Sequence, residues 1–214
     1  YCTIYAFAES PLTPGELWVG TDDGLVHLSR DGGDSWMPLS VPGLPEWATI
    51  ARIEPSAHHA GTAYLAAHAY RLQDPRPLVF RTDDFGATWE PISAGIPQDE
   101  WARSIREDPA SADLLFLATE RRVWFSVDRG VTWASLRGNM PSVPVYDVKV
   151  RGHELIAGTH GRAFWILDDL APLREIAAAP LDEPVLFAPP LAYRYATPDG
   201  FDMPGEGKDG RAHV

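Results

Sequence analysis

The octet Ser29-Arg30-Asp31-Gly32-Gly33-Asp34-Ser35-Trp36 recurs as Thr82-Asp83-Asp84-Phe85-Gly86-Ala87-Thr88-Trp89 and as Ser126-Val127-Asp128-Arg129-Gly130-Val131-Thr132-Trp133. Each copy follows a short apolar run and leads into another, so each is predicted to be the turn of a β-hairpin. The hydroxyl and the aspartate can accept hydrogen bonds from turn amides, the glycine supplies a positive φ, and the tryptophan covers the hairpin. We therefore interpret the positions that recur in the three octets as structural: Ser29, Asp31, Gly33, Trp36, Thr82, Asp84, Gly86, Trp89, Ser126, Asp128, Gly130 and Trp133.

The octets belong to a longer repeat of four short strands. A strand ending in a proline turn, at Pro11, Pro55 or Pro109, precedes a second apolar strand, and the octet then joins the third strand to the fourth. A fourth unit without an octet follows, with strands expected at 145–150, 154–158 and 162–167. Repeated units of this length and content predict an all-β fold, a β-propeller of four-stranded antiparallel blades.

About four blades are expected, as part of a larger ring, because propellers close with about four to eight blades. The predicted domain spans residues 1–178, with blades at about 1–42, 43–93, 94–137 and 138–178. Residues 179–214 are expected to be a C-terminal strand and linker extension that is partly disordered, with strands at 185–187 and 192–195, and a short helix is expected at 170–179.

Composition limits the function classes. The formal net charge is -12, and no run of Lys and Arg is present, which argues against a nucleic-acid partner. No apolar stretch is long enough for a transmembrane helix, and no cofactor motif or metal-ligand spacing is found, so neither membrane insertion, cofactor nor metal is expected. The single cysteine, Cys2, is expected to be a buried strand residue.

The octets resemble the Asp-box, or BNR, repeat that sialidases, sortilin-type receptors and the xyloglucan-hydrolysing tandem propellers share. Together with the stretches 18–25 and 158–169, they resemble the C-terminal blades of bacterial sortilin-like propellers labelled as glycosyl hydrolases. The resemblance implies that further blades complete the ring, from sequence beyond this chain or from another copy, and it favours a secreted or periplasmic protein. It supplies no catalytic residue, because neither the sialidase arginine triad nor the xyloglucanase aspartates can be aligned.

Antiparallel connectivity places the octets on one rim of the propeller and directs attention to the loops of the opposite rim. From turn proline to octet aspartate, the second unit has 29 residues where the first has 20, and the surplus falls at 67–75. Because loop insertions tend to carry function, His68, Tyr70 and Arg71 are candidate ligand-binding residues, with an ornamental or oligomer-contacting loop as the alternative.

The loops between units bring an aromatic residue to the start of each innermost strand. Trp47, Trp101 and Tyr146 are candidate platforms for a sugar, or core residues that fill the funnel between the inner strands. His160 and Arg162 lie in a tight turn on the same rim and are candidates for binding an anionic group.

Two functional hypotheses remain open. The first is a binding module whose rim recognises a glycan or a protein. The second is a glycoside hydrolase-like enzyme whose cleft is completed by blades outside this sequence; because such enzymes use two facing carboxylates, its candidate catalytic residues are Glu46, Asp74, Asp99 and Glu100.

Overall fold

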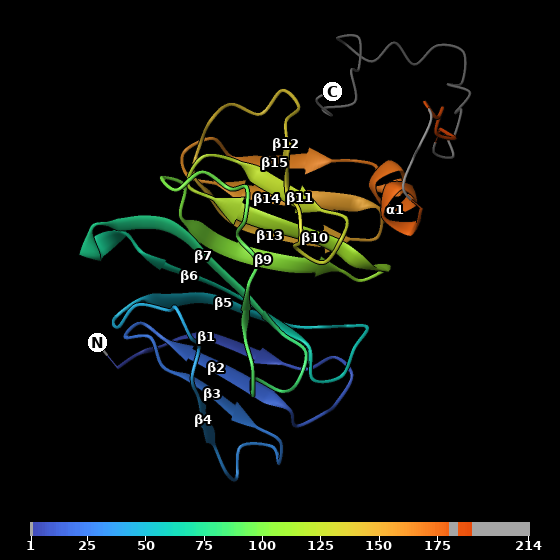
Figure 1. The fold of residues 1–214 in the computed structure, drawn as a ribbon. Helices are drawn as coiled ribbons and strands as arrows, with labels where there is room; N and C mark the ends of the chain where they lie inside the picture. Colours follow the sequence, from blue (N-terminus) through green and yellow to red (C-terminus); the bar gives the residue numbers. More distant parts are fainter. Residues whose placement is uncertain (1, 180–183, 190–214) are drawn as a thin grey trace, which may run out of the picture.

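The computed structural model describes residues 2–179 and 184–189, and within them the chain forms four antiparallel sheets in succession (Figure 1). The first sheet contains β1 (Ile4–Glu9), β2 (Leu17–Thr21), β3 (Val26–Ser29) and β4 (Met37–Leu39). The second contains β5 (Thr49–Pro55), β6 (Ala63–Ala69), β7 (Asp74–Thr82) and β8 (Glu90–Pro91). The third contains β9 (Ala102–Asp108), β10 (Ser111–Thr119), β11 (Val123–Ser126) and β12 (Ala134–Leu136). The fourth contains β13 (Val145–Arg151), β14 (Glu154–Thr159) and β15 (Phe164–Leu167), and helix α1 (Ala171–Ala178) follows it.

Within every sheet the strands pair in chain order, and the first strands of successive sheets contact one another, β1 with β5, β5 with β9 and β9 with β13. This is the arrangement of consecutive propeller blades, each an up-and-down meander with its first strand innermost. The predicted all-β fold is confirmed, and we number the sheets as blades one to four. Blade four has three strands among the described residues, where the others have four.

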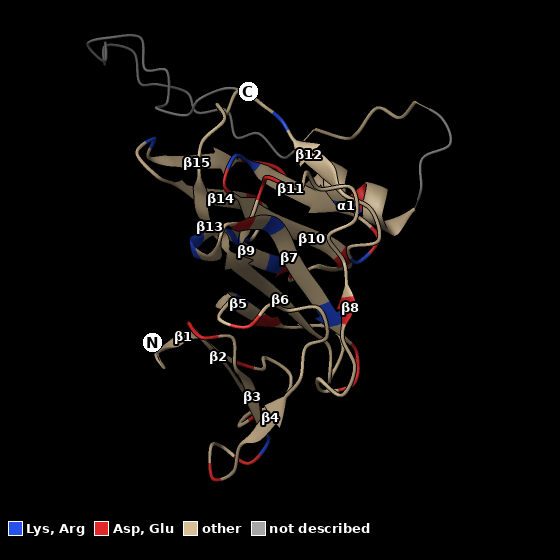
Figure 2. Ribbon diagram, turned by 60° about the vertical axis from the view of Figure 1, so that its left-hand side comes forward, with Lys and Arg blue, Asp and Glu red and all other residues tan. Residues whose placement is uncertain are grey.

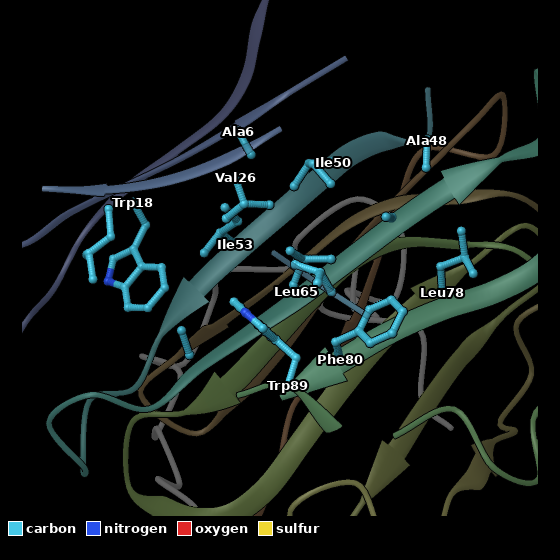
Figure 3. Packing of buried hydrophobic residues seen from close by; sticks show 14 of the residues in the cluster. Ala6, Trp18, Val26, Ala48, Ile50, Ile53, Leu65, Leu78, Phe80 and Trp89 are labelled. Carbon is cyan, nitrogen blue, oxygen red and sulfur yellow. The ribbon is translucent and has the colours of Figure 1, made fainter. Parts of the chain in front are cut away.

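Three apolar cores lie between the blades rather than within them. Between blades one and two, Ile50, Ile53 and Leu65 face Ala6 and Trp18, as Figure 3 shows. Two further clusters join blade two to blade three and blade three to blade four, the last with α1 packed against it. Each blade therefore buries its faces only against its neighbours, as repeat architectures require.

The octets form the predicted turns, and their hydrogen bonds are satisfied inside each hairpin. The Ser29 hydroxyl donates to Asp31 Oδ1 at 2.8 Å and accepts from the amide of Gly33 at 2.8 Å, while Asp31 Oδ1 accepts from the amide of Ser35 at 2.9 Å. The octets that begin at Thr82 and Ser126 repeat this pattern. All three octet glycines have positive φ, at 100°, 80° and 88° in chain order, as predicted.

Some sequence-based expectations need correction. The insertion at 67–75 is mostly strand, because β6 extends to Ala69 and β7 begins at Asp74, leaving only a 3₁₀ turn at Tyr70–Leu72. The small side chains of Ala67 and Ala69 pack into the core between blades one and two, and this burial stabilises the longer strand.

At the two ends of the chain, Cys2 is exposed rather than buried, since β1 begins only at Ile4. The helix expected at 170–179 is present as α1. Residues 185–187 form no strand, and the strand expected at 192–195 lies outside the described residues. No helix in the described part of the chain is long and apolar enough to cross a membrane.

Candidate functional site

The candidate site lies on the rim opposite the octets. The turns β2–β3, β6–β7, β10–β11 and β14–β15 reach this rim, together with the loops that enter β5, β9 and β13. In the described part of the chain, Lys and Arg are interspersed with Asp and Glu along the ribbon (Figure 2).

A row of stacked side chains begins in blade two. The rings of His68 and Tyr70 lie 4.9 Å apart between centroids, and the ring of Tyr70 stacks on Trp101 at 5.1 Å with an interplanar angle of 21°. His68 is the buried penultimate residue of β6, Tyr70 lies in the 3₁₀ turn, and Trp101 immediately precedes β9. The extended β6–β7 hairpin of blade two therefore contacts the residue that precedes β9 of blade three.

Arg103 continues the row to blade four. Its guanidinium carbon lies 5.8 Å from the ring centroid of Trp101 and 4.2 Å from that of Tyr146, and Tyr146 stacks on His160 at 5.2 Å. Glu120 binds the guanidinium and holds it in place. Cation–π contacts of this kind contribute about 0.5–2 kcal/mol each. We call the following residues the rim row: His68, Tyr70, Trp101, Arg103, Tyr146 and His160.

Burial of His68 determines the charge at one end of the rim row. Burial, with a smaller contribution from the nearby Arg103, lowers the pKa of His68 to about 4. His68 is therefore neutral at physiological pH and offers one ring nitrogen as donor and the other as acceptor. The positive charge of the row resides in Arg103, paired with Glu120.

A cavity of about 270 Å³ opens beside His68, between blades one and two. Its lining residues include Asp22, Trp47, Thr49, Arg71 and Leu72. Trp47 is 51% exposed and has φ of 64°, a left-handed conformation that is unfavourable for a bulky side chain. Such outliers occur preferentially at functional sites, where the surrounding structure maintains them. The strained Trp47 is thus presented at the mouth of the cavity.

The four candidate catalytic carboxylates occupy different environments. Glu100 is completely buried, accepts from Trp124 Nε1 at 2.6 Å and pairs with Arg122 at 2.9 Å. Asp99 pairs with Arg121 at 2.6 Å. Both groups serve as hydrogen-bond acceptors for neighbouring structure.

Asp74 forms a two-pronged ion pair with Arg76, which holds the pKa of its carboxyl below the usual range. Glu46 lies in the loop before β5 and lines an open pocket of about 550 Å³ together with Trp47 and Asp23. The structure places these carboxylates on separate loops, and neither lines the 270 Å³ cavity.

The structure brings together most of the candidate binding residues. His68, Tyr70, Trp101, Tyr146 and His160 form the rim row, and Trp47 and Arg71 share the cavity with His68. Arg162 lies in the turn beside His160, where its carbonyl accepts from Trp165 Nε1.

Sequence reasoning missed Arg103, Asp22 and Thr49. A basic residue two positions after Trp101 on an innermost strand lies on the same face of that strand, which was a readable signal for Arg103. Asp22 lies in the tight turn after β2 and Thr49 is the first residue of β5, and neither position has a sequence pattern that indicates ligand binding.

Below the rim, ion pairs fix the blades that carry the row. Arg106 of β9 donates to Glu54 of β5 at 2.9 Å and pairs with Asp147 of β13 at 3.1 Å, so one guanidinium joins three blades. Among the described residues, no group of three or more potential ligands is placed to hold a metal ion.

Comparisons with known proteins show the fold. No family model and no curated relative matches this chain. A structure of YCF48 bound to D1 peptide matches with a TM-score of 0.59 and 15% identity over 78% of this chain and 51% of that one. The GH74 xyloglucanase from Xanthomonas campestris matches with a TM-score of 0.59 and 17% identity over 77% of this chain and 29% of that one.

The extracellular domain of BT4673 from B. thetaiotaomicron matches with a TM-score of 0.57 and 15% identity over 76% of this chain and 20% of that one. The chain thus spans about half, or less, of the length of these proteins. At such identities the likeness establishes a shared propeller architecture, and function has to be argued from the site.

Proposed function

We propose that this chain is a propeller module that binds a glycan or a protein segment on the rim opposite its octets. The observation that carries the proposal is the rim row, which extends over blades two to four beside a cavity of about 270 Å³. Ligand sites are typically concave, rich in aromatic side chains and equipped with a few fixed polar groups. The row and the cavity together have that composition.

The polar groups suit a ligand with both donors and acceptors. Asp22, Thr49 and Arg71 line the same cavity as Trp47, with Asp22 Oδ1 accepting from the Thr3 amide at 2.9 Å and the Thr49 hydroxyl donating to the Asp22 carbonyl at 3.4 Å. Sugar hydroxyls or a peptide backbone and its side chains can use such a set. The likeness to a propeller solved with a bound peptide supports the peptide, and the likeness to a xyloglucanase supports the glycan.

Hydrolysis of a glycan is the alternative, favoured by the GH74 likeness. Glycosidases need two carboxyl groups separated by about 5–9.5 Å across the bond that they cleave. Among the described residues that line the cavity, Asp22 is the single carboxylate. Binding without turnover is therefore the function that the site supports better.

The test is a binding screen of the full chain against glycan and peptide arrays. A hit should lose at least tenfold in affinity on Trp47→Ala, because an exposed aromatic contact is removed. Trp36→Ala is the matched control, since Trp36 is 41% exposed on the octet rim and should leave the affinity unchanged.

An equal effect of the two substitutions, or no hit on either array, would contradict the proposal. Release of reducing sugar from a glycan hit, abolished by Asp22→Asn, would establish the hydrolase alternative instead.

A further inference from the structure

Blade four ends on an open strand edge. Blades one to three each carry a short fourth strand, β4, β8 or β12, whereas β15 pairs only with β14 among the described residues. An unpaired edge exposes backbone donors and acceptors that can take up another strand. The side chains of Phe164 and Ile166 on β15 are exposed as well.

An apolar cavity of about 290 Å³ lies beside this edge, between blade three and blade four. Its walls include Leu136 and Met140 from the outer part of blade three, and Leu155, Trp165 and Leu167 from blade four. This second cavity is separate from the rim site and has no residue in common with it.

The corresponding places between the other blades are occupied by octet tryptophans. Trp89 belongs to the core between blades one and two, and Trp133 packs against the core between blades two and three. Trp89 shares its core with Leu39, which lies three positions after Trp36, and Trp133 Nε1 donates to the carbonyl of Ile92, which lies three positions after Trp89. The equivalent residue at the third interface is Leu136, which lines the cavity. Blade four has no octet, so the cavity is the place of the tryptophan that it lacks.

We propose that the C-terminal segment Phe187-Ala188-Pro189 docks along β15 as the fourth strand of blade four, with the ring of Phe187 in the 290 Å³ cavity. The segment repeats the order aromatic, any residue, proline that leads into two of the three fourth strands, at Trp36-Met37-Pro38 and Trp89-Glu90-Pro91; the third, entered through Trp133-Ala134-Ser135, has the aromatic residue without the proline. Addition of an extended segment to a sheet edge, anchored by alternate side chains in pockets, is a common mode of peptide docking.

The chain can reach the edge. Leu173 and Ala177 of α1 pack against the same core as Trp165, so the helix lies close to the cavity. Phe187 lies eight positions after Ala179, a reach of about 26–29 Å when extended. In the described conformation the segment is outside any strand and Leu186 is 97% exposed, which leaves it available to dock.

Hydrogen–deuterium exchange of β15 in the full chain tests the proposal. Phe187→Asp should speed exchange of the β15 amides by at least tenfold, because a buried charge at the anchor is unfavourable. Leu186→Ser is the matched control: its side chain points the other way and exchange should match the wild type. Exchange in β6 should be the same in all three proteins, which shows that the fold is intact.

Equal β15 exchange in the wild type and Phe187→Asp would overturn the proposal. Protection of β15 that rises with protein concentration would overturn it too, because the added strand would then come from a second copy. A failure here leaves the rim site unaffected, since the two cavities lie between different pairs of blades.

Discussion

The octets of blades one and two have the same internal hydrogen bonds and different surroundings. Trp36 is 41% exposed, whereas Trp89 is 8% exposed and meets Trp18 of blade one edge-on at 6.3 Å. A methyl group added at Gly86 would lie 2.4 Å from Leu39 Cδ1 of the preceding blade, whereas at Gly33 the nearest such contact is 3.6 Å, within blade one. The octet therefore does two things: it closes its own hairpin, and it packs that hairpin onto the preceding blade.

The inner strands show the same contrast. Phe7 of blade one and Ile53 of blade two occupy equivalent positions on the innermost strands. Phe7 pairs with Val19 of β2, and Ile53 pairs with Leu65 of β6. Ile53 is 1% exposed against blade one, whereas Phe7 is 60% exposed. Blade one thus exposes a large apolar side chain at the position where blade two buries one against its neighbour. That a further blade or another copy covers this face remains a prediction.

The largest difference is expected at the inner strands. Ile53→Ala should lower the free energy of unfolding by about 2–5 kcal/mol, because it leaves a cavity in a core. Phe7→Ala should cost less than about 1 kcal/mol, the usual range for exposed positions. Urea denaturation of both variants measures this, and equal losses would show that the face of blade one is covered in solution.

The octet glycines should differ next. Gly86→Val should cost about 2–4 kcal/mol, since a β-branched residue resists positive φ and its methyl groups would overlap Leu39. Gly33→Val should cost only the backbone term of about 1–2 kcal/mol. Thermal melts of the two variants give the comparison. An unchanged melting temperature for Gly86→Val would contradict the assigned turn.

A smaller difference is expected for the tryptophan Nε1 groups. Trp133 Nε1 donates to the carbonyl of Ile92 in the preceding blade at 2.6 Å. Trp133→Phe should therefore cost about 1 kcal/mol, the usual net contribution of one hydrogen bond, while Trp36→Phe should be nearly neutral. Denaturation midpoints in urea distinguish the two. A larger loss for Trp36→Phe would place a partner on the face of blade one.

The smallest difference is expected at the octet aspartates, whose bonds lie within each hairpin. The Ser35 hydroxyl and amide lower the pKa of Asp31 to about 2, and the same contacts from Thr88 lower the pKa of Asp84. A carboxyl with a folded pKa below its unfolded value of 3.8 stabilises the fold above about pH 4, and that contribution is lost as the pH falls toward 2.

Asp31→Asn and Asp84→Asn should therefore reduce stability equally at pH 7, and NMR titration of the wild type should show both carboxyls with low pKa. A normal pKa for either carboxyl would mean that its turn is not closed as described.

The hairpins were predictable from sequence because their hydrogen bonds join residues two to four positions apart, as from Ser29 to Asp31 and Gly33. The burial of Glu100 was not, because its partner Trp124 lies 24 positions away, in β11. The stacking of Tyr70 on Trp101 depends on the angle between two blades and on the extension of β6, which residue types alone do not encode.

The central claim, that ligand binds on the rim opposite the octets, is tested most directly by oxidative footprinting of the tryptophans in the full chain. With a ligand from the binding screen present, the account predicts that oxidation of Trp47 falls severalfold while oxidation of Trp36 is unchanged. Protection of Trp36 with Trp47 still reactive would contradict the account, because the ligand would then lie on the octet side of the propeller.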